Sequence, residues 1–330
     1  MKQLKFVAAA LGLAFVQAAT AQAWPAKPIK LIIPLAAGGA TDKAARLVAQ
    51  RLTTALGQQV VAENVTGASG AIALQRLAQS EPDGYTLGAT ANSLHTVAPH
   101  MGKLPYDTLT SFTFAGTYAS FDYVLITAPN SPYRNIGDLV ARARKEPGAV
   151  SYGSSGVGTG NHLAGALFGQ LAKADLNSIP YRGGSPAILD VMAGRTDFMF
   201  DVVGGAIAQI EGVKVKALGV SGTSRHALLP NVPVIADTVP GYESGGWFAL
   251  IGPAHLPAPI VQRLNAELNK MQASPEFREQ LAALGYSTLP GTPADVEKRL
   301  KAETAKWGEV VGKLPCAAVP ERMGCATASK

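Results

Sequence analysis

Residues 29–57 read IKLIIPLAAGGATDKAARLVAQRLTTALG, and this stretch decides the fold class. Its first six residues, 29–34, form an apolar run that predicts a buried strand. Residues 41–56 then place Ala and Leu at helical spacing, and Gly57 is a typical helix stop. A buried strand that enters a helix through a Gly-Gly turn is the repeating unit of a parallel α/β sheet.

The same alternation continues along the chain. A long β-prone stretch covers residues 112–128. Further strands are expected at 59–64, 85–91, 149–154, 176–181, 196–201, about 216–221 and 247–251. Helices are expected at 70–79, 136–145, 160–172, 185–193, 257–273, 275–284 and 293–311. This order predicts an α/β protein with two mostly parallel sheets flanked by helices, and segments near 118–126 and 240–250 are candidate crossings between two domains.

The N-terminus has the three-part layout of a secretory signal. Lys2 and Lys5 precede an apolar run over residues 6–16, and Ala21-Gln22-Ala23 supplies small residues at a cleavage site. A membrane anchor is the alternative, but the apolar run is shorter than the ~20 residues that span a bilayer. We therefore expect a periplasmic protein that is cut after Ala23 and begins at Trp24.

Composition excludes several classes of function. Hydrophobic residues make up 47% and charged residues 16% of the chain, which indicates a folded protein with a sizeable core. Basic residues are scattered and the net charge is +6, so no nucleic-acid surface is expected. The only two cysteines, Cys316 and Cys325, could pair with each other, and no Cys/His cluster has metal spacing. We expect no metal and no cofactor.

Four loops follow predicted strands, where open parallel sheets bind ligands, and all of them except 91–93 precede predicted helices. They cover residues 36–42, 91–93, 154–162 and 181–185. Free N–H groups at helix starts favour an anion, and Gly39 is a candidate for a positive φ. Each loop has a plainer interpretation: a capped turn for the first, a surface arginine for Arg182. The third loop resembles a dinucleotide fingerprint, but Asn161 stands in place of its third glycine.

A catalytic interpretation has little support in the sequence. No Gly-x-Ser-x-Gly elbow occurs, and no paired carboxylates stand out. Ser155 and His162 are seven residues apart, which allows contact, so a hydrolase stays open as an alternative. We expect the protein not to be an enzyme.

Several motifs together resemble one family. They are Trp24-Pro25-x-Lys27-Pro28-Ile29, Pro34-x-x-x-Gly38-Gly39-x-x-Asp42-x-x-Ala45-Arg46, Glu63-Asn64, Pro82-Asp83-Gly84-Tyr85-Thr86-Leu87, Leu104-Pro105-Tyr106-Asp107, Tyr152-Gly153-Ser154, Gly158-Thr159-x-x-His162-Leu163-Ala164, Pro180-Tyr181-Arg182-Gly183-Gly184 and Trp247-Phe248. The chain resembles the Bug-type extracytoplasmic solute receptors, the substrate-binding subunits of tripartite tricarboxylate transporters. The resemblance runs from about Trp24 to Trp307, and the tail from Leu314 to Lys330 extends past the usual family end.

The resemblance implies a two-domain, type II periplasmic-binding-protein fold that closes like a flytrap. With the candidate crossings, it suggests a signal peptide over 1–23, a first domain from 24–122 and 246–330, and a second domain from 123–245. It implies a carboxylate-bearing ligand: a dicarboxylate, an amino acid or an aromatic acid. The residues expected to face the ligand are Ala36, Ala37, Gly38, Gly39, Thr41, Asp42, Asn92, Ser93, Ser154, Ser155, Thr159, Arg182, Gly183 and Asp201.

The function expected from the sequence is therefore capture of a small organic anion by a monomeric periplasmic receptor. Its partners would be the membrane subunits of a tripartite tricarboxylate-type transporter. A sensor subunit that docks on a signalling receptor is an alternative on the same fold.

Overall fold

The computed structural model describes residues 24–181 and 183–314. The predicted signal segment, Arg182, and the tail with Cys316 and Cys325 lie outside the described residues. None of the helices in the described ranges is both long enough and apolar enough to span a membrane.

The element order confirms the α/β alternation expected from the sequence. The strands are β1 (Ile29–Ile33), β2 (Val60–Asn64), β3 (Thr86–Ala91), β4 (Phe112–Thr127), β5 (Val150–Ser154), β6 (Leu176–Pro180), β7 (Phe198–Val202), β8 (Lys216–Val220) and β9 (Gly245–Pro253). The helices are α2 (Ala40–Leu56), α3 (Ala71–Ala78), α4 (Ser93–Thr96), α5 (Ala98–Met101), α6 (Ile136–Lys145), α7 (Gly160–Ala172), α8 (Gly184–Met192), α9 (Val203–Glu211), α10 (Ala258–Ala273), α11 (Pro275–Ala283) and α12 (Pro293–Gly312). Two short 3₁₀ turns, Ala68–Gly70 and Ile235–Asp237, complete them.

The strands join in the order β2-β1-β3-β9-β4-β7-β5-β6, with β8 also paired to β4. β1 is parallel to β2 and β3, and β5 is parallel to β6 and β7, as the alternation predicts. The strands between these two groups are antiparallel: β9 to β3, and β4 to β9, β7 and β8. The sheet is therefore mixed, because the chain crosses and returns through strands of opposite direction.

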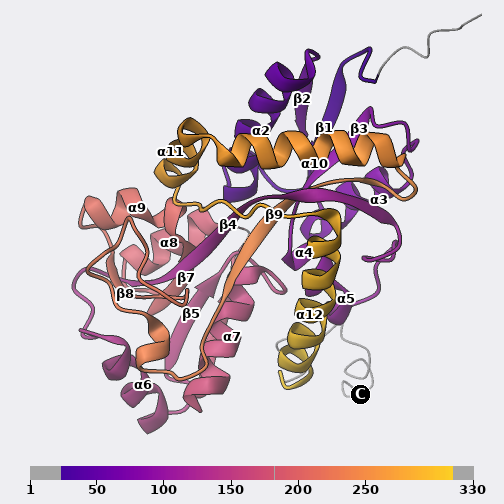
Figure 1. Cartoon of the computed structure of the whole chain (residues 1–330). Helices are drawn as coiled ribbons and strands as arrows, with labels where there is room; N and C mark the ends of the chain where they lie inside the picture. The colour runs from indigo at the N-terminus through magenta and orange to yellow at the C-terminus, as the bar shows by residue number, and fades with distance from the viewer. Residues whose placement is uncertain (1–23, 182, 315–330) are drawn as a thin grey trace, which may run out of the picture.

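β4 and β9 connect the two groups of strands. Residues 112–122 of β4 pair with β9, and residues 123–127 pair with β7 and β8. Both predicted crossings fall on or beside these two strands. Figure 1 shows β4 and β9 running between a group around β1 and β3 and a group around β5 and β7.

The helices cover the sheet on both sides, with α10 lying across the first group of strands beside α2 (Figure 1). α7 packs on β7, and α12 packs on β4 and α4. The core contains large aromatic side chains near the crossing strands, where Tyr118 stacks on Phe248. Burial of such side chains stabilises the protein by roughly 1.5–3 kcal/mol each.

The sequence missed three helices that border the site, namely the short helices α4 and α5 and the longer helix α9. α9 begins at Val203 directly after β7. Its first turn contains Gly204 and Gly205, which are poor helix formers, so the pattern did not reveal it.

Candidate functional site

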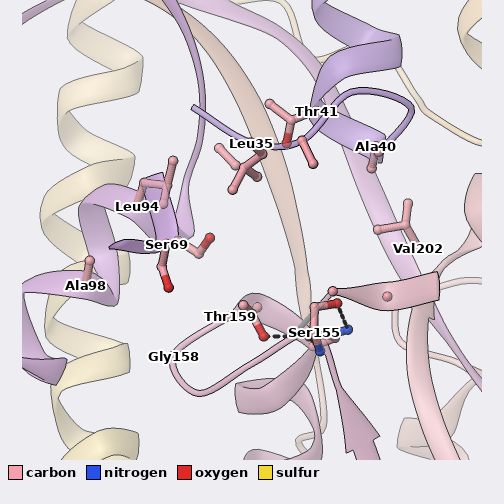
Figure 2. A pocket seen from close by; sticks show the side chains of 18 of the residues that line it. Leu35, Ala40, Thr41, Ser69, Leu94, Ala98, Ser155, Gly158, Thr159 and Val202 are labelled. Carbon is pink, nitrogen blue, oxygen red and sulfur yellow. Dashed lines mark hydrogen bonds between the residues drawn. The ribbon is translucent and has the colours of Figure 1, made fainter. Parts of the chain in front are cut away.

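A large cleft lies where the carboxyl-end loops of the two strand groups meet. Its volume is about 1410 Å³, and it is open to solvent. Leu35 lies in the loop before α2, and Ala40 and Thr41 lie in the first turn of α2. All three lie across the cleft from Ser155 and Thr159 (Figure 2). Small-molecule pockets usually measure 300–1,000 Å³. The cleft is therefore wider than a metabolite needs, as expected of an open flytrap.

The structure brings most of the expected site residues to this cleft. Those that line it are Ala36, Ala37, Gly38, Gly39, Thr41, Ser93, Ser155, Thr159, Gly183 and Asp201. Asp42, Asn92 and Ser154 do not line it, and Arg182 lies outside the described residues.

Asp42 is buried behind the glycine loop instead of facing the cleft. Its carboxylate accepts hydrogen bonds from the Gly38 N–H at 2.8 Å, from Arg46 Nε at 2.9 Å and from Asn64 Nδ2 at 2.9 Å. Burial alone would raise the pKa of Asp42, but these bonds outweigh it and hold the pKa below its usual value. Asp42 therefore fixes the loop that borders the cleft.

The loop conformation corrects one expectation. Gly39 has an extended backbone with φ −75°, which any residue adopts. Gly38 has φ +80°, the left-handed region that favours glycine. The glycine pair is needed for the turn at Gly38 and for open space at Gly39.

Asn92 and Ser154 support the walls from behind. Asn92 Nδ2 donates to Glu303 Oε2 at 3.0 Å, and Trp247 Nε1 donates to Glu303 Oε1 at 2.8 Å. This network ties the end of β3 to β9 and α12. Ser154 is fully buried, and its Oγ accepts a 3.4 Å hydrogen bond from the Gly156 N–H.

The loop before α7 is held by its own polar groups. Asn161 Nδ2 donates to Ser155 Oγ at 2.9 Å, and the Thr159 hydroxyl donates to the Gly156 carbonyl at 2.7 Å. The Gly158 N–H donates to Nδ1 of His162 at 3.3 Å. Burial lowers the pKa of His162 to about 4, so the ring is neutral at pH 7 and can accept this bond.

These contacts bear on the hydrolase alternative. Ser155 is engaged with Asn161, and His162 with Gly158. The hydrogen bonds recorded for the described residues do not join Ser155 to His162 as a nucleophile–base pair would require.

The decisive feature of the cleft is the set of helix N-termini that face it. The N-cap residues of α2, α7, α8 and α9 are Gly39, Thr159, Gly183 and Val202, and each of them lines the cleft. None of the four helices has a side-chain hydrogen bond at its N-cap. Of the helices that begin away from the cleft, α6, α11 and α12 are capped by Asn135, Ser274 and Thr292, whereas α10 has no side-chain cap at Pro257.

Uncapped N-termini favour anions. Each presents free N–H groups and about half a positive charge from the aligned peptide dipoles. Lys43 and Lys103 also line the cleft, whereas Asp201 is the single acidic side chain among its described lining residues. The walls therefore attract a negative group at α2, α7 and α8, away from Asp201.

Apolar side chains also line the cleft. Among them, Ile72 is 51% exposed and Val157 is 40% exposed. Leu94 and Ala98 lie on the same side of the cleft as Ser69, and Val202 lies across from them (Figure 2). These side chains give the cleft apolar surface beside its free N–H groups.

Sequence reasoning missed several of these residues. Lys43 stands one turn into a helix, Tyr286 lies far along the chain, and neither carries a local motif. Within the described ranges, no group of three or more His, Cys, Asp or Glu side chains could hold a metal ion.

Comparison with known proteins decides the family. Residues 44–315 match the protein family described as "Tripartite tricarboxylate transporter family receptor". The chain belongs to this family. The match confirms the resemblance drawn from the sequence motifs, and the receptor is a solute-binding protein of the periplasmic type.

Individual relatives agree along nearly the whole receptor. A protein of Pseudomonas sp., named from the tcbD-tcbE intergenic region, is 36% identical over 307 residues, which is 92% of this chain and 91% of the relative. The structure of R. palustris Rpa4515 with adipate is 30% identical, with a TM-score of 0.83, and the match covers 90% of this chain and 98% of that one. MatC from Rhodopseudomonas palustris with bound malate is 27% identical, with a TM-score of 0.80, covering 87% and 100%.

Proposed function

We propose that the receptor captures a small carboxylate-bearing metabolite in the cleft between its two domains. It would then present the metabolite to the membrane subunits of a tripartite tricarboxylate-type transporter. The observation that carries the proposal is the convergence of uncapped helix N-termini on one cleft. The bound adipate and malate of two relatives support the same ligand chemistry.

Desolvation of the ligand favours such a site. Closing the cleft would remove a carboxylate from water, which is costly unless hydrogen bonds replace the lost ones. The free N–H groups of α2, α7 and α8 supply such bonds without an opposing charge that must itself be desolvated. The exposed Ile72 and Val157 would be covered in the same movement.

The proposal assigns one domain to residues 24–122 and 246–330 and the other to 123–245. The exchange of β4 partners between Asp122 and Tyr123 supports the first boundary. The hinge would then lie in the strands β4 and β9. Removal of a signal after Ala23 and action as a monomer in the periplasm belong to the same proposal.

A thermal-shift screen tests the proposal. Purified receptor is melted with a panel of aliphatic dicarboxylic, aromatic and amino acids, and with their neutral amides as controls. An acid at 100 times its dissociation constant should stabilise the fold by ~2.7 kcal/mol. If none of the acids raises the melting temperature more than its amide does, the proposed function is wrong.

A further inference from the structure

One side chain of the cleft has the wrong charge for an acid receptor. Asp201 is the only acidic residue that lines the cleft within residues 24–181 and 183–314. It lies near the end of β7, where its neighbour in the pairing is Val124 of β4, and directly before the start of α9. An anion-binding cleft has to accommodate this carboxylate.

The carboxylate has few partners. Its Oδ1 accepts a 2.9 Å hydrogen bond from the Val202 N–H. No other hydrogen bond to it is recorded from the described residues, and no cation there lies within the 4.0 Å of an ion pair. Gly205 leaves room beside it, since a Cβ at that position would lie 3.1 Å from Oδ2.

None of the charged and titratable groups described near Asp201 forms an ion pair or a hydrogen bond with its carboxylate. Lys43 of α2 is close enough to lower the pKa of Asp201, yet burial dominates and raises that pKa to about 6. Tyr286 donates its hydroxyl hydrogen to the Ala40 carbonyl at 3.1 Å. Burial raises the pKa of Tyr123 and Tyr286, and the charge of Asp201 adds to both shifts.

Closure of the cleft around a ligand would make the charge on Asp201 more costly. A ligand carboxylate is repelled by an ionised Asp201, so the anionic end belongs at the other N-termini. Domain closure would also move Asp201 further from water, and a buried charge without a donor is costly. A donor on the ligand itself would remove this cost.

We propose that Asp201 is a specificity residue that selects acids with a hydrogen-bond donor, above all an ammonium group, on the part of the molecule away from the anchored carboxylate. This inference rests on the proposed function and narrows its ligand class. Oδ2, beside Gly205, is the acceptor open to such a donor. A charge-assisted hydrogen bond of this kind is stronger than a neutral one.

Calorimetric titration of matched acids tests the inference. The probes are aspartate against succinate, glutamate against glutarate, phenylalanine against 3-phenylpropanoate, and 6-aminohexanoate against hexanoate. Malate against succinate provides a neutral donor. Each is titrated into the wild type, into Asp201→Asn, and into Asp237→Asn, which makes the same charge change at an exposed position outside the cleft lining.

In at least one pair the wild type should bind the amino acid tighter than its plain acid. Asp201→Asn should reduce that preference by about tenfold or more, since hydrogen bonds to charged groups contribute about 1.5–3 kcal/mol. Asp237→Asn should leave the preference unchanged. Circular dichroism and melting of each variant confirm that it is folded.

The other outcomes overturn the inference. If plain acids bind at least as tightly as their amino counterparts, the inference fails while the proposed function stands. An ion pair formed between Lys43 and Asp201 on domain closure would give this result. A preference that survives in Asp201→Asn also overturns it. If none of the probes binds, the inference fails, and the thermal-shift panel decides separately whether the acid-receptor function stands.

Discussion

The neutral state of His162 should make the receptor sensitive to acid. The ring is 1% exposed, and burial lowers its pKa from 6.5 to about 4. Its Nδ1 accepts the Gly158 N–H at 3.3 Å, and protonation there would replace an acceptor with a second donor. The loop of residues 158–161, which lines the cleft, depends on this bond.

The direction in which stability changes with pH follows from the lowered pKa of His162. As pH falls below 6.5, the unfolded chain binds a proton at this position before the folded chain does, so the free energy of unfolding decreases. The decrease continues to about pH 4, where the folded ring also becomes charged. With about 1.36 kcal/mol per pKa unit, His162 should reduce the stability by about 2.5 kcal/mol between pH 7.5 and pH 4.5.

The test compares the wild type with His162→Asn. The Asn side-chain oxygen can accept the Gly158 N–H near the position of Nδ1, and it does not titrate. Urea unfolding is followed by circular dichroism at several pH values between 7.5 and 4.5. His95 is equally buried and its pKa is also lowered to about 4, so both proteins should lose stability on acidification, the variant by about 2.5 kcal/mol less.

The control is His255→Asn. His255 is exposed and has φ +64°, a conformation that Asn tolerates well. This variant should follow the wild-type pH profile. If His162→Asn also runs parallel to the wild type, then His162 does not titrate as its burial implies and the reasoning is refuted.

Three further predictions concern the cleft, the contact of α9 with Leu284 and the signal segment. The Gly39→Val variant should fold, because φ is −75° and an added Cβ lies 3.4 Å from the Ala36 carbonyl oxygen. Its ligand-induced stabilisation should be lost. Retained affinity in a calorimetric titration would show that Gly39 does not face the ligand. Gly204→Ala should lower the free energy of unfolding by about 1–3 kcal/mol or more in urea, because the new Cβ would overlap the Leu284 carbonyl oxygen. In the control variant Gly312→Ala the new Cβ meets nothing within 4 Å, and the stability should not fall. The intact mass of periplasmic protein should correspond to a start at Trp24, and an uncut chain would contradict the predicted cleavage after Ala23.

Much of the fold was predictable because local signals agreed with it. The strand at residues 29–33 and the helix at 40–56 were expected within one residue at each end, since apolar spacing and Gly57 define them. The antiparallel pairing of β4 with β9 was not expected. That pairing joins residues more than a hundred positions apart, and no pattern within either strand encodes its partner.

The site residues likewise include some that the sequence could predict and some that it could not. Gly39, Thr159 and Gly183 were found because loops between strands and helices have a sequence signature. The orientation of Asp42 could not be predicted from local sequence, because it depends on Arg46 and on Asn64 of β2. Whether a polar side chain faces a cleft or braces its wall is a property of tertiary packing.

The central claim is that the cleft holds a carboxylate through helix N-termini, and one calorimetric comparison tests it most directly. The acid that gives the largest thermal shift is titrated into the wild type beside its primary amide, which has nearly the same shape but no charge. The account predicts that the acid binds at least tenfold more tightly, because the uncapped N-termini of α2, α7 and α8 stabilise the charge. Equal affinity for the acid and the amide would contradict it.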